Sequence, residues 1–431
     1  MKMKLTNAEK AILDGSQGGM MQQVMKTIVA YGEALEAEAL ADITGMGHFV
    51  IANAIPGISP SVGMLDSLVE AGLKTIHAFT LDPAAPLDYE NWWLTPEQIE
   101  TLSRMYVDQE RYDRRMLALG LRDMQAFTCT PYQPEVGSIP QRGDILAWSE
   151  SACVVFANSV LGARCNRNGA IIDLLCNIAG KVPLSGLLTD AGRRATWKIH
   201  VATQQLPLPQ ILGAAVGRMV LGDVPYITGL DGFLGPGIDG RTRDYLHELG
   251  AAAAAAGAVG LLHVENITPE AVDFKAGLLD KEYRQGIIDD ADLEDLTASY
   301  PVLWEDPHAD PEKCFLGCPH LSLRQLSWWA NQIRAGLERH GSHHFKVNTT
   351  MCAAPQVLEK FKGARGDWAT LTEAGVRFSS ACPMQAFDND LSRHDAIITN
   401  SNKLRTYTHA RFFPDNEIVD IIITGRIRRG P

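Results

Sequence analysis

Three cysteines each lie at the end of an apolar run of the sequence. Cys129 in FTCTPY, Cys318 in FLGCPH and Cys382 in SSACPM each precede a proline at the next position or the one after. Proline stops a strand and fixes the loop that carries the sulfur. Three thiolates on an iron–sulfur cluster would leave one iron without a protein ligand. Such an iron can take a substrate hydroxyl as a Lewis acid, and the reaction class that follows is dehydration.

Two other interpretations of these cysteines remain open. A free cysteine is commonly a small buried hydrophobic residue, and Cys153, Cys165 and Cys176, which lie in apolar helical sequence, are assigned to that class. A nucleophilic cysteine is the other alternative and needs a base; His320 lies only two places after Cys318, which is weak support. The sequence has neither the tight spacing of the common iron–sulfur motif nor the paired CxxC motifs of zinc sites.

The composition indicates a globular protein with a substantial core. The chain has 431 residues, of which 46% are hydrophobic and 21% charged, so it can form two or three lobes. Its net charge of -12 comes without a basic patch, which argues against a nucleic-acid partner. Residues 1–15 lack the apolar core of a signal peptide, and the apolar run at 251–262 is too short to span a bilayer. We therefore expect a cytoplasmic protein with no membrane partner, whose cysteines are free thiols or metal ligands.

Helical and extended patterns alternate along the chain, which predicts an α/β fold. The predicted helices cover residues 5–15, 20–40, 59–72, 95–121 and 245–257, and the predicted strands of the first part cover 48–54, 74–80 and 124–132. The last third repeats a strand–loop–helix unit three times, which predicts a parallel sheet. Ligands of open α/β sheets bind beyond the carboxyl ends of the strands, where Cys318, Cys352, Cys382 and the loop 399–403 fall.

Longer segments of the chain resemble the aconitase X family, a branch of the aconitase superfamily. They are FTCTPY (127–132), AWSESACVVFANSVLGARCNRNG (147–169), HVENITPEA (263–271), FLGCPHLSL (315–323) and TNSNKLRTY (399–407). The resemblance implies an aconitase-like large-subunit fold, with several parallel or mixed sheet lobes covered by helices around a central cleft. It also implies a hydro-lyase with an iron–sulfur cluster held by three cysteines. Activities of the family are dehydration of cis-3-hydroxy-L-proline and of mevalonate 5-phosphate.

The resemblance also assigns roles to single residues. The implied cluster ligands are Cys129, Cys318 and Cys382; the implied catalytic residues are Ser149, Glu150, Ser151 and His48; the implied substrate-binding residues are Arg164, Arg167, Asn158, Lys403 and Ser401. Each side chain also has an ordinary structural interpretation: a salt bridge for the arginines, a carboxylate in the first turn of a helix for Glu150, a satisfied core histidine for His48 and a solvated ammonium for Lys403.

The expected organisation is a main body of residues 1–300 and a C-terminal lobe of residues 301–431. The small swivelling domain that supplies a serine base in the family is expected to be absent from this chain and to come as a separate subunit. The chain departs from the family pattern at SGLLTDAGRR (185–194), where the family often has a histidine, and at Ser380 and Ala381, where it usually has aspartate and threonine. These departures affect the substrate rather than the thiolates.

We expect cis-3-hydroxy-L-proline as the substrate, because the sequence shows no glycine-rich phosphate loop and no clustered basic pocket. A protonated imino group would also suit a carboxylate such as Glu150. The alternatives are mevalonate 5-phosphate as the substrate, or a non-catalytic aconitase-like subunit that has lost its cluster.

Overall fold

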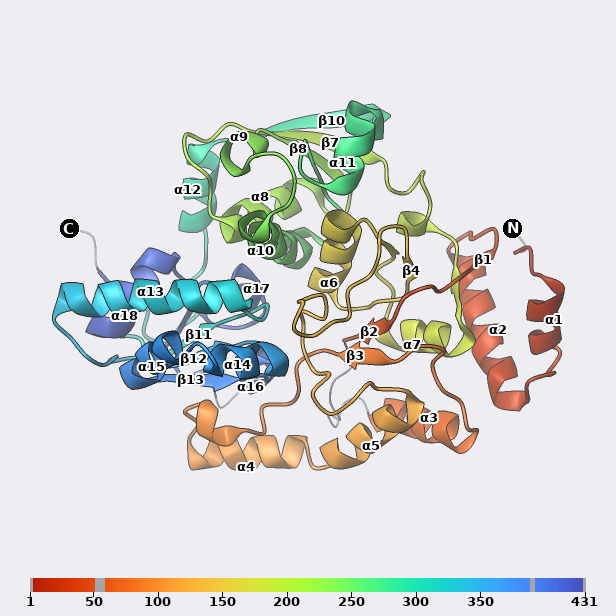
Figure 1. Cartoon of the computed structure of the whole chain (residues 1–431), viewed down its shortest axis with the longest axis horizontal. Helices are drawn as coiled ribbons and strands as arrows, with labels where there is room; N and C mark the ends of the chain where they lie inside the picture. Colours follow the sequence, from red (N-terminus) through yellow and green to blue (C-terminus); the bar gives the residue numbers. More distant parts are fainter. Residues whose placement is uncertain (1–2, 51–58, 388–391, 429–431) are drawn as a thin grey trace.

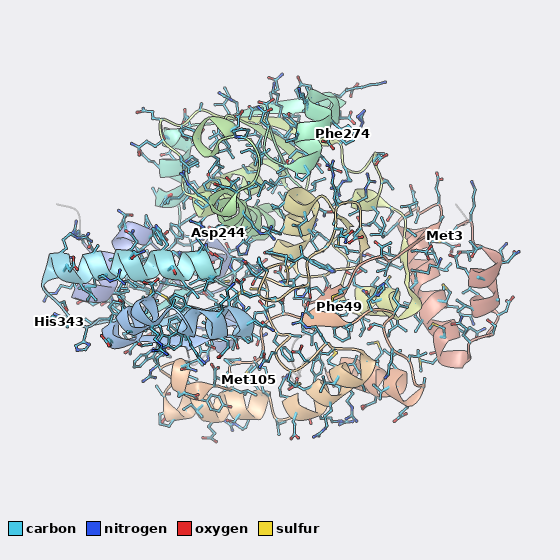
Figure 2. All side chains as sticks on the ribbon, in the orientation of Figure 1. Met3, Phe49, Met105, Asp244, Phe274 and His343 are labelled. Carbon is cyan, nitrogen blue, oxygen red and sulfur yellow. The ribbon has the colours of Figure 1, made fainter. Side chains whose placement is uncertain are left out.

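The computed structural model describes residues 3–50, 59–387 and 392–428. It contains several parallel sheets covered by helices, which confirms the predicted α/β class (Figure 1). The labelled Phe274 and His343 lie at the periphery of the molecule, whereas Phe49 lies inside, where it is 1% exposed (Figure 2). Part of the predicted strand 48–54 lies outside the described residues.

The N-terminal part consists of helices packed around three two-stranded sheets. β2 pairs with β3 and β4 with β5 in parallel, and β1 pairs with β6 antiparallel. The elements are α1 (Asn7–Leu13), α2 (Gly19–Ala34), β1 (Leu40–Asp42), β2 (Gly47–Phe49), α3 (Ser59–Glu70), β3 (Phe79–Leu81), α4 (Pro96–Met105), α5 (Gln109–Leu119), β4 (Ile145–Leu146), α6 (Ser151–Phe156), β5 (Arg164–Cys165), α7 (Ala170–Ala179) and β6 (Lys181–Pro183). Apolar side chains of α2, α3, α5 and α7 share one core with those of β2 and β3.

The middle part surrounds a four-stranded parallel sheet with the order β10–β7–β8–β9. Its elements are β7 (Ala195–Val201), α8 (Pro209–Val220), β8 (Pro225–Thr228), α9 (Asp231–Leu234), α10 (Gly240–Gly257), β9 (His263–Val264), α11 (Pro269–Phe274), β10 (Leu279–Ile288) and α12 (Asp290–Ala298). The alanine-rich α10 packs against α8 and α6 at the centre of the molecule (Figure 1). A side chain at Gly257 would overlap the backbone of Gly217, so glycine at both positions permits this close approach.

The C-terminal part surrounds a five-stranded parallel sheet with the order β13–β12–β11–β14–β15. Its elements are β11 (Lys313–Leu316), α13 (Leu323–His340), β12 (Asn348–Cys352), α14 (Pro355–Lys362), α15 (Arg365–Ala374), β13 (Val376–Ser379), α16 (Pro383–Phe387), β14 (Ile397–Thr399), α17 (Asn402–Tyr407), β15 (Arg411–Phe412) and α18 (Asp415–Thr424). Cys314 and Leu316 face the core formed with α13 and α18, whereas Phe315 faces the other side, as the two-residue period of a strand requires.

The three predicted strand–loop–helix units are present, whereas two other predicted elements differ from the structure. The single helix predicted at 95–121 divides into α4 and α5, because Leu102 and Tyr106 pack into a different apolar cluster from Tyr112 and Met116. The predicted strand 124–132 forms only one bridge, from Phe127 to β3. The division of the chain at residue 300 stays a prediction.

Among the described residues, no helix combines the length and the apolar character that crossing a bilayer demands.

Candidate active site

Two sets of strand ends meet at the centre of the molecule. In the C-terminal sheet, the parallel strands β11 and β13 lead directly to Cys318 and Cys382, β12 ends at Cys352, and β14 leads to the start of α17, which carries Lys403. All four groups therefore lie at the same edge of this sheet. This edge is where ligands of parallel sheets bind.

The second set of strand ends comes from the N-terminal part. Isolated parallel bridges join β3 to Phe127 and β2 to Trp148. The chain segments that lead to Cys129, Asp82 and Glu150 consequently run side by side and end at one level. A glutamate, an aspartate and a thiol from distant parts of the sequence are thus brought together.

Hydrogen bonds join the two edges. The Cys382 N–H donates to the Ala84 carbonyl at 3.2 Å, two residues beyond Asp82. The His320 N–H donates to the Cys129 sulfur at 3.2 Å. Each bond joins the C-terminal part to the N-terminal part, so the loops that carry the thiols are held together.

A buried ion pair lies between the two edges. Lys403 Nζ binds Glu150 Oε1, and the two side chains are only 9% and 2% exposed. Glu150 Oε2 accepts the Cys153 N–H at 2.6 Å and so caps the start of α6. Burial by itself raises the pKa of Glu150, but the charge and hydrogen bond of Lys403, helped by the Cys153 N–H, lower it to about 2. Burial likewise lowers the pKa of Lys403, and the Glu150 charge more than reverses this. Both groups are therefore charged at neutral pH.

Two serines hold the ion pair in place. The Ser401 hydroxyl donates to the Cys318 carbonyl and accepts the Leu404 N–H at 3.0 Å, which ties the lysine loop to a cysteine loop. The Ser151 hydroxyl lies 3.5 Å from Glu150 Oε1. Ser401 thus uses its hydroxyl within the fold, and its contribution is to position Lys403.

A histidine–aspartate pair stands beside the ion pair. His48 is fully buried; its Nδ1 lies 2.8 Å from Thr80 Oγ1, and its Nε2 lies 3.5 Å from Asp82 Oδ1. Neither of the two facing atoms has another hydrogen-bond partner among the described residues. Burial raises the pKa of Asp82 to about 6; the Glu150 charge adds to the rise and His48 opposes it. Asp82 is therefore a carboxyl group that can hold a proton close to neutral pH.

The raised pKa of Asp82 predicts how the stability of the metal-free chain depends on pH. Unfolded, this carboxyl group loses its proton near pH 3.8, whereas in the folded chain it does so near pH 6. Between these values the folded state holds the extra proton, so stability falls as the pH rises through this interval and stays lower above it. We expect Asp82→Asn to remove this fall and to be more stable than wild type at neutral pH, by up to about 3 kcal/mol. Urea unfolding on both sides of the interval measures this; an identical pH dependence in both proteins would contradict it.

The three predicted cluster ligands surround this carboxyl group. Cys129, Cys318 and Cys382 are 9%, 8% and 8% exposed. Burial raises the pKa of each thiol, and the charge of Asp82 acts on all three. Lys403 opposes the rise for Cys129 and Cys318. The three thiols thus lie close enough to Asp82 for its charge to act on each of them, and their role as ligands stays a prediction.

Cys352 is a fourth thiol in the same region. It ends β12, it is fully buried, and it packs in the same apolar cluster as Cys318. Burial raises the pKa of Cys352, and the neighbouring thiols Cys382 and Cys318 add to the rise.

Among the described residues, no three or more His, Cys, Asp or Glu side chains are grouped so as to hold a metal ion. A cluster of several atoms is held at separate corners, so its ligands stand farther apart than those of one ion.

Unpaired polar atoms next to the thiols indicate that a bound group completes the site. Tyr132 Oη, both ring nitrogens of His247 and His320 Nε2 are buried and have no hydrogen-bond partner among the described residues. The Tyr132 ring stacks on the Phe156 ring with 3.8 Å between the ring centroids, and the His247 ring packs edge-on against both. Burial lowers the pKa of His247 to about 4 and of His320 to about 3, so both rings are neutral. Buried polar atoms without partners are rare and point to a ligand, an ion or water.

Gly317 is required by the loop that presents Cys318. Its φ is +100°, and a Cβ there would lie 2.2 Å from the Cys352 carbonyl oxygen. We expect Gly317→Ala to lower the free energy of unfolding by about 2 kcal/mol or more, because both the backbone conformation and the close approach become unfavourable. Chemical denaturation measures this, with Gly366→Ala, where nothing lies within 4 Å of the added Cβ, as the matched control. Equal losses in the two variants would contradict the prediction.

Four other predicted residues are engaged differently. The Ser149 hydroxyl accepts the Val50 N–H at 2.9 Å, at the end of β2 next to His48. The Asn158 amide is buried and bonded to the backbone of Cys165 and Gly260 and to Arg193. Arg164 forms an ion pair with Asp190, and Arg167 lines a separate hollow. No contact joins Asn158, Arg164 or Arg167 to the three thiols among the described residues, and their role in binding the substrate stays a prediction.

Sequence reasoning missed Asp82, Tyr132 and His247. Asp82 lies in TLDP (80–83), directly after an apolar run and before a proline, so the criterion applied to the cysteines could have found it. Tyr132 ends the segment FTCTPY but has no feature of its own. His247 is a single histidine on an alanine-rich helix, and nothing in the surrounding sequence indicates a functional role.

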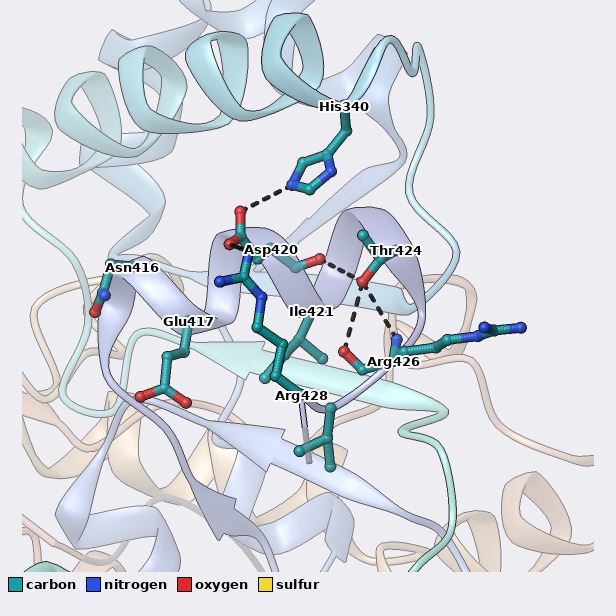
Figure 3. Close-up of a pocket in the computed structure, with 9 residues that line it drawn as sticks. His340, Asn416, Glu417, Asp420, Ile421, Thr424, Arg426 and Arg428 are labelled. Atoms are coloured by element: carbon teal, nitrogen blue, oxygen red, sulfur yellow. Dashed lines mark hydrogen bonds and ion pairs between the residues drawn. The ribbon is translucent and has the colours of Figure 1, made fainter. Parts of the chain in front are cut away.

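A separate hollow of about 520 Å³ lies beside α18 (Figure 3). It is lined by His340, Asp420 and the segment 426–428, and it shares no lining residue with the thiols or the ion pair. The chemistry described above is therefore not located there.

Comparison with known proteins places this geometry in a family. The family models described as Aconitase X first domain and Aconitase X second domain match residues 2–191 and 195–298. The phosphomevalonate dehydratase large subunit of Thermococcus kodakarensis is 33% identical over 339 residues, which cover 77% of this chain and 78% of that protein. The chain belongs to the aconitase X family.

Two further relatives fit this assignment. A crystal structure of Thermococcus kodakaraensis aconitase X in its holo-form superposes with a TM-score of 0.78 at 28% identity, covering 97% of this chain and 99% of that one. The cis-3-hydroxy-L-proline dehydratase of Hypocrea jecorina is 28% identical over 361 residues, 79% of this chain but only 54% of that protein. The predicted family, fold and enzyme class are confirmed: this aconitase X protein is a dehydratase, that is, a hydro-lyase.

Proposed function

We propose that this aconitase X chain is the cluster-bearing subunit of a dehydratase that removes water from a small hydroxylated carboxylic acid. The observation that carries the proposal is the buried Lys403–Glu150 ion pair, which lies where the thiol-bearing strand ends of two sheets meet. A buried ion pair is rarely optimal for stability alone, and it is more readily explained as part of a site.

Cys129, Cys318 and Cys382 would hold an iron–sulfur cluster. Burial keeps these thiols protonated in the metal-free chain, so a metal must displace their protons to bind. The unpaired nitrogens and hydroxyl of His320, His247 and Tyr132 support the fit, because they could donate to a bound sulfide or substrate oxygen. When bound, the cluster supplies a Lewis-acidic iron for the substrate hydroxyl.

The chain's own side chains then bind the substrate and move its proton. Lys403 has one ammonium hydrogen on Glu150 and offers the others to a substrate carboxylate. Asp82 and His48 Nε2, 3.5 Å apart, hold the proton that the departing hydroxyl needs. Thr80, at Nδ1, fixes the orientation of the imidazole.

The charges of the site favour cis-3-hydroxy-L-proline as the substrate. Glu150 neutralises Lys403, and the neighbouring pair of Asp82 and His48, which holds one proton, adds no net charge. The nearby Arg243 donates one terminal N–H to the Tyr132 carbonyl and packs over the Phe156 ring, while its Nε has no hydrogen-bond partner among the described residues. The Lys403–Glu150 ion pair matches the carboxylate and the protonated imino group of the hydroxyproline, whereas the two pairs offer no net positive charge to a phosphate dianion.

Mevalonate 5-phosphate is the second candidate substrate. It is favoured by the similarity to the phosphomevalonate dehydratase large subunit, which extends over more than three quarters of both chains. A partner subunit could supply the cations that a phosphate requires.

A separate small subunit is part of this proposal, since the Thermococcus kodakarensis relative is named a large subunit. It would supply the serine base that removes the carbon-bound proton, as the family resemblance implies. A cytoplasmic location stays a prediction.

The test is an anaerobic co-purification with the small subunit, followed by assays with cis-3-hydroxy-L-proline and with mevalonate 5-phosphate. We expect kcat/KM for the hydroxyproline to be higher by about a hundredfold or more. Turnover of mevalonate 5-phosphate alone would overturn the substrate assignment. An iron-containing complex that dehydrates neither compound would overturn both substrate candidates.

A further inference from the structure

A second polar hollow, of about 360 Å³, opens between α2, the loop after β5 and the amino end of β8. Its lining includes Tyr31, Asn166, Arg167, Asn168, Ser185 and Gly260. Its described lining contains one cation, no carboxylate and no residue of the candidate active site. In a chain of net charge -12, a hollow of this kind is unusual.

The cation in this hollow is free to bind a ligand. Arg167 has no hydrogen-bond, ion-pair or ring partner among the described residues. The nearby arginines are paired: Arg164 with Asp190, and Arg193 with Glu270 at 2.8 Å. Arg167 is thus the one member of this group whose planar set of donors is not used by the protein.

The surrounding backbone accommodates the Arg167 side chain. A Cβ at Gly260 would lie 3.1 Å from Arg167 Cδ and 2.7 Å from a methyl group of Leu187, so glycine leaves room for the guanidinium stem. Asn166 is fixed beside it, because its amide donates to the Ser185 carbonyl at 2.9 Å and accepts the Leu187 N–H at 2.7 Å. Asn166 and the backbone around the hollow are therefore fixed, whereas the Arg167 side chain is exposed to solvent at the hollow.

The opposite wall is also positioned and carries no charge. The Tyr31 hydroxyl donates to Asn168 Oδ1 at 3.0 Å, and the Asn168 amide donates to Asp173 Oδ1 at 2.9 Å. Asp173 is fully buried behind this wall, and no cation pairs with it among the described residues. Burial raises its pKa well above the ordinary range, which favours the uncharged form of this carboxyl group.

We infer that this hollow is an anion site, which takes the phosphate or carboxylate group of a small molecule through the Arg167 guanidinium. Bidentate recognition of such groups is the characteristic use of arginine. Tyr31, Asn168 and Ser185 lie in the part of the chain matched as the first family domain, whereas Val224 and Gly260 lie in the part matched as the second. The hollow thus lies where the two matched parts of the chain meet. The inference does not depend on the proposed reaction.

Isothermal titration of the full chain with inorganic phosphate, and separately with acetate, tests the site. We expect one saturable site for at least one of these anions. Arg167→Gln should weaken the binding about ten- to a hundredfold, because hydrogen bonds to a charged partner are lost. Arg167→Lys should bind with intermediate affinity, since it keeps the charge but not the two parallel donors. The matched control is Arg104→Gln, which changes an exposed arginine on α4 and should bind like wild type.

The results also separate this site from the active site. Lys403→Met should bind the anion like wild type, because Lys403 does not line the hollow. The inference is overturned if wild type binds neither anion, if Arg167→Gln binds as tightly as wild type, or if Lys403→Met abolishes the binding. Circular dichroism of each variant establishes that the loss of binding is not a loss of fold.

Discussion

Replacing Lys403 by methionine is expected to lower the free energy of unfolding by roughly 3–5 kcal/mol, because Glu150 is left as an unpaired buried charge. The same change should reduce kcat/KM about a hundredfold or more, since the substrate carboxylate loses its charged donor. Urea denaturation of the chain and an assay of the complex with its small subunit measure the two effects. The stability loss should be largest at neutral pH and should shrink in acid, where the unpaired Glu150 becomes protonated.

A double variant separates the two effects of Lys403. Lys403→Met combined with Glu150→Gln removes both charges and keeps an acceptor for the Cys153 N–H. The double variant should regain most of the lost free energy of unfolding, because it leaves no unpaired buried charge and the effects of paired groups are not additive. It should regain none of the lost activity, because the Lys403 ammonium group is still absent. If the single variant were as stable as wild type, the buried ion pair described here would be wrong. If the double variant were fully active, the proposed role of Lys403 would be wrong.

Replacing Cys318 by alanine is expected to abolish iron binding and to bring dehydration down to background. Cys318, a predicted ligand, lies where the strand ends of the two parts of the chain meet. We expect an iron–sulfur cluster that keeps only two of its three thiolate ligands to be lost from the protein. Iron analysis and visible absorption after anaerobic reconstitution measure the effect. The variant should keep the far-ultraviolet circular dichroism of wild type, since Cys318 contributes only a small buried side chain to its apolar cluster.

Cys314→Ala is the matched control for this change. Cys314 lies on β11, is equally buried and belongs to the core on the opposite side of the sheet. It should keep its iron and its activity. Loss of iron from the Cys314 variant and retention in the Cys318 variant would contradict the assignment of ligands.

The C-terminal sheet could be predicted well from the sequence, because the signals that determine its elements lie close together along the chain. Each strand–loop–helix unit has a short apolar run, a turn with proline or glycine and an amphipathic helix, and parallel connections leave few alternative topologies. The positions of Cys318 and Cys382 at strand ends followed directly. The serine cap of α13 at Ser322 is an equally local signal.

The groups that the sequence could not predict are those that depend on long-range contacts. Residues 124–132 have the composition of a strand, but they form only one bridge to β3 and continue as the loop that carries Cys129. Glu150 and Lys403 are 253 residues apart in the chain, and no pattern indicates that they form an ion pair. The arginines of the segment 147–169 were predicted at the substrate from the family resemblance, but the fold pairs Arg164 with Asp190 and places Arg167 at a separate hollow.

The most direct measurement is the iron and acid-labile sulfide content of the anaerobically reconstituted full chain, compared with a variant in which Cys129, Cys318 and Cys382 are all alanine. We predict a brown wild-type protein with iron and sulfide bound in cluster stoichiometry, and a folded, colourless triple variant with neither. A folded wild-type chain that binds no iron, or a triple variant that binds as much as wild type, would contradict the account.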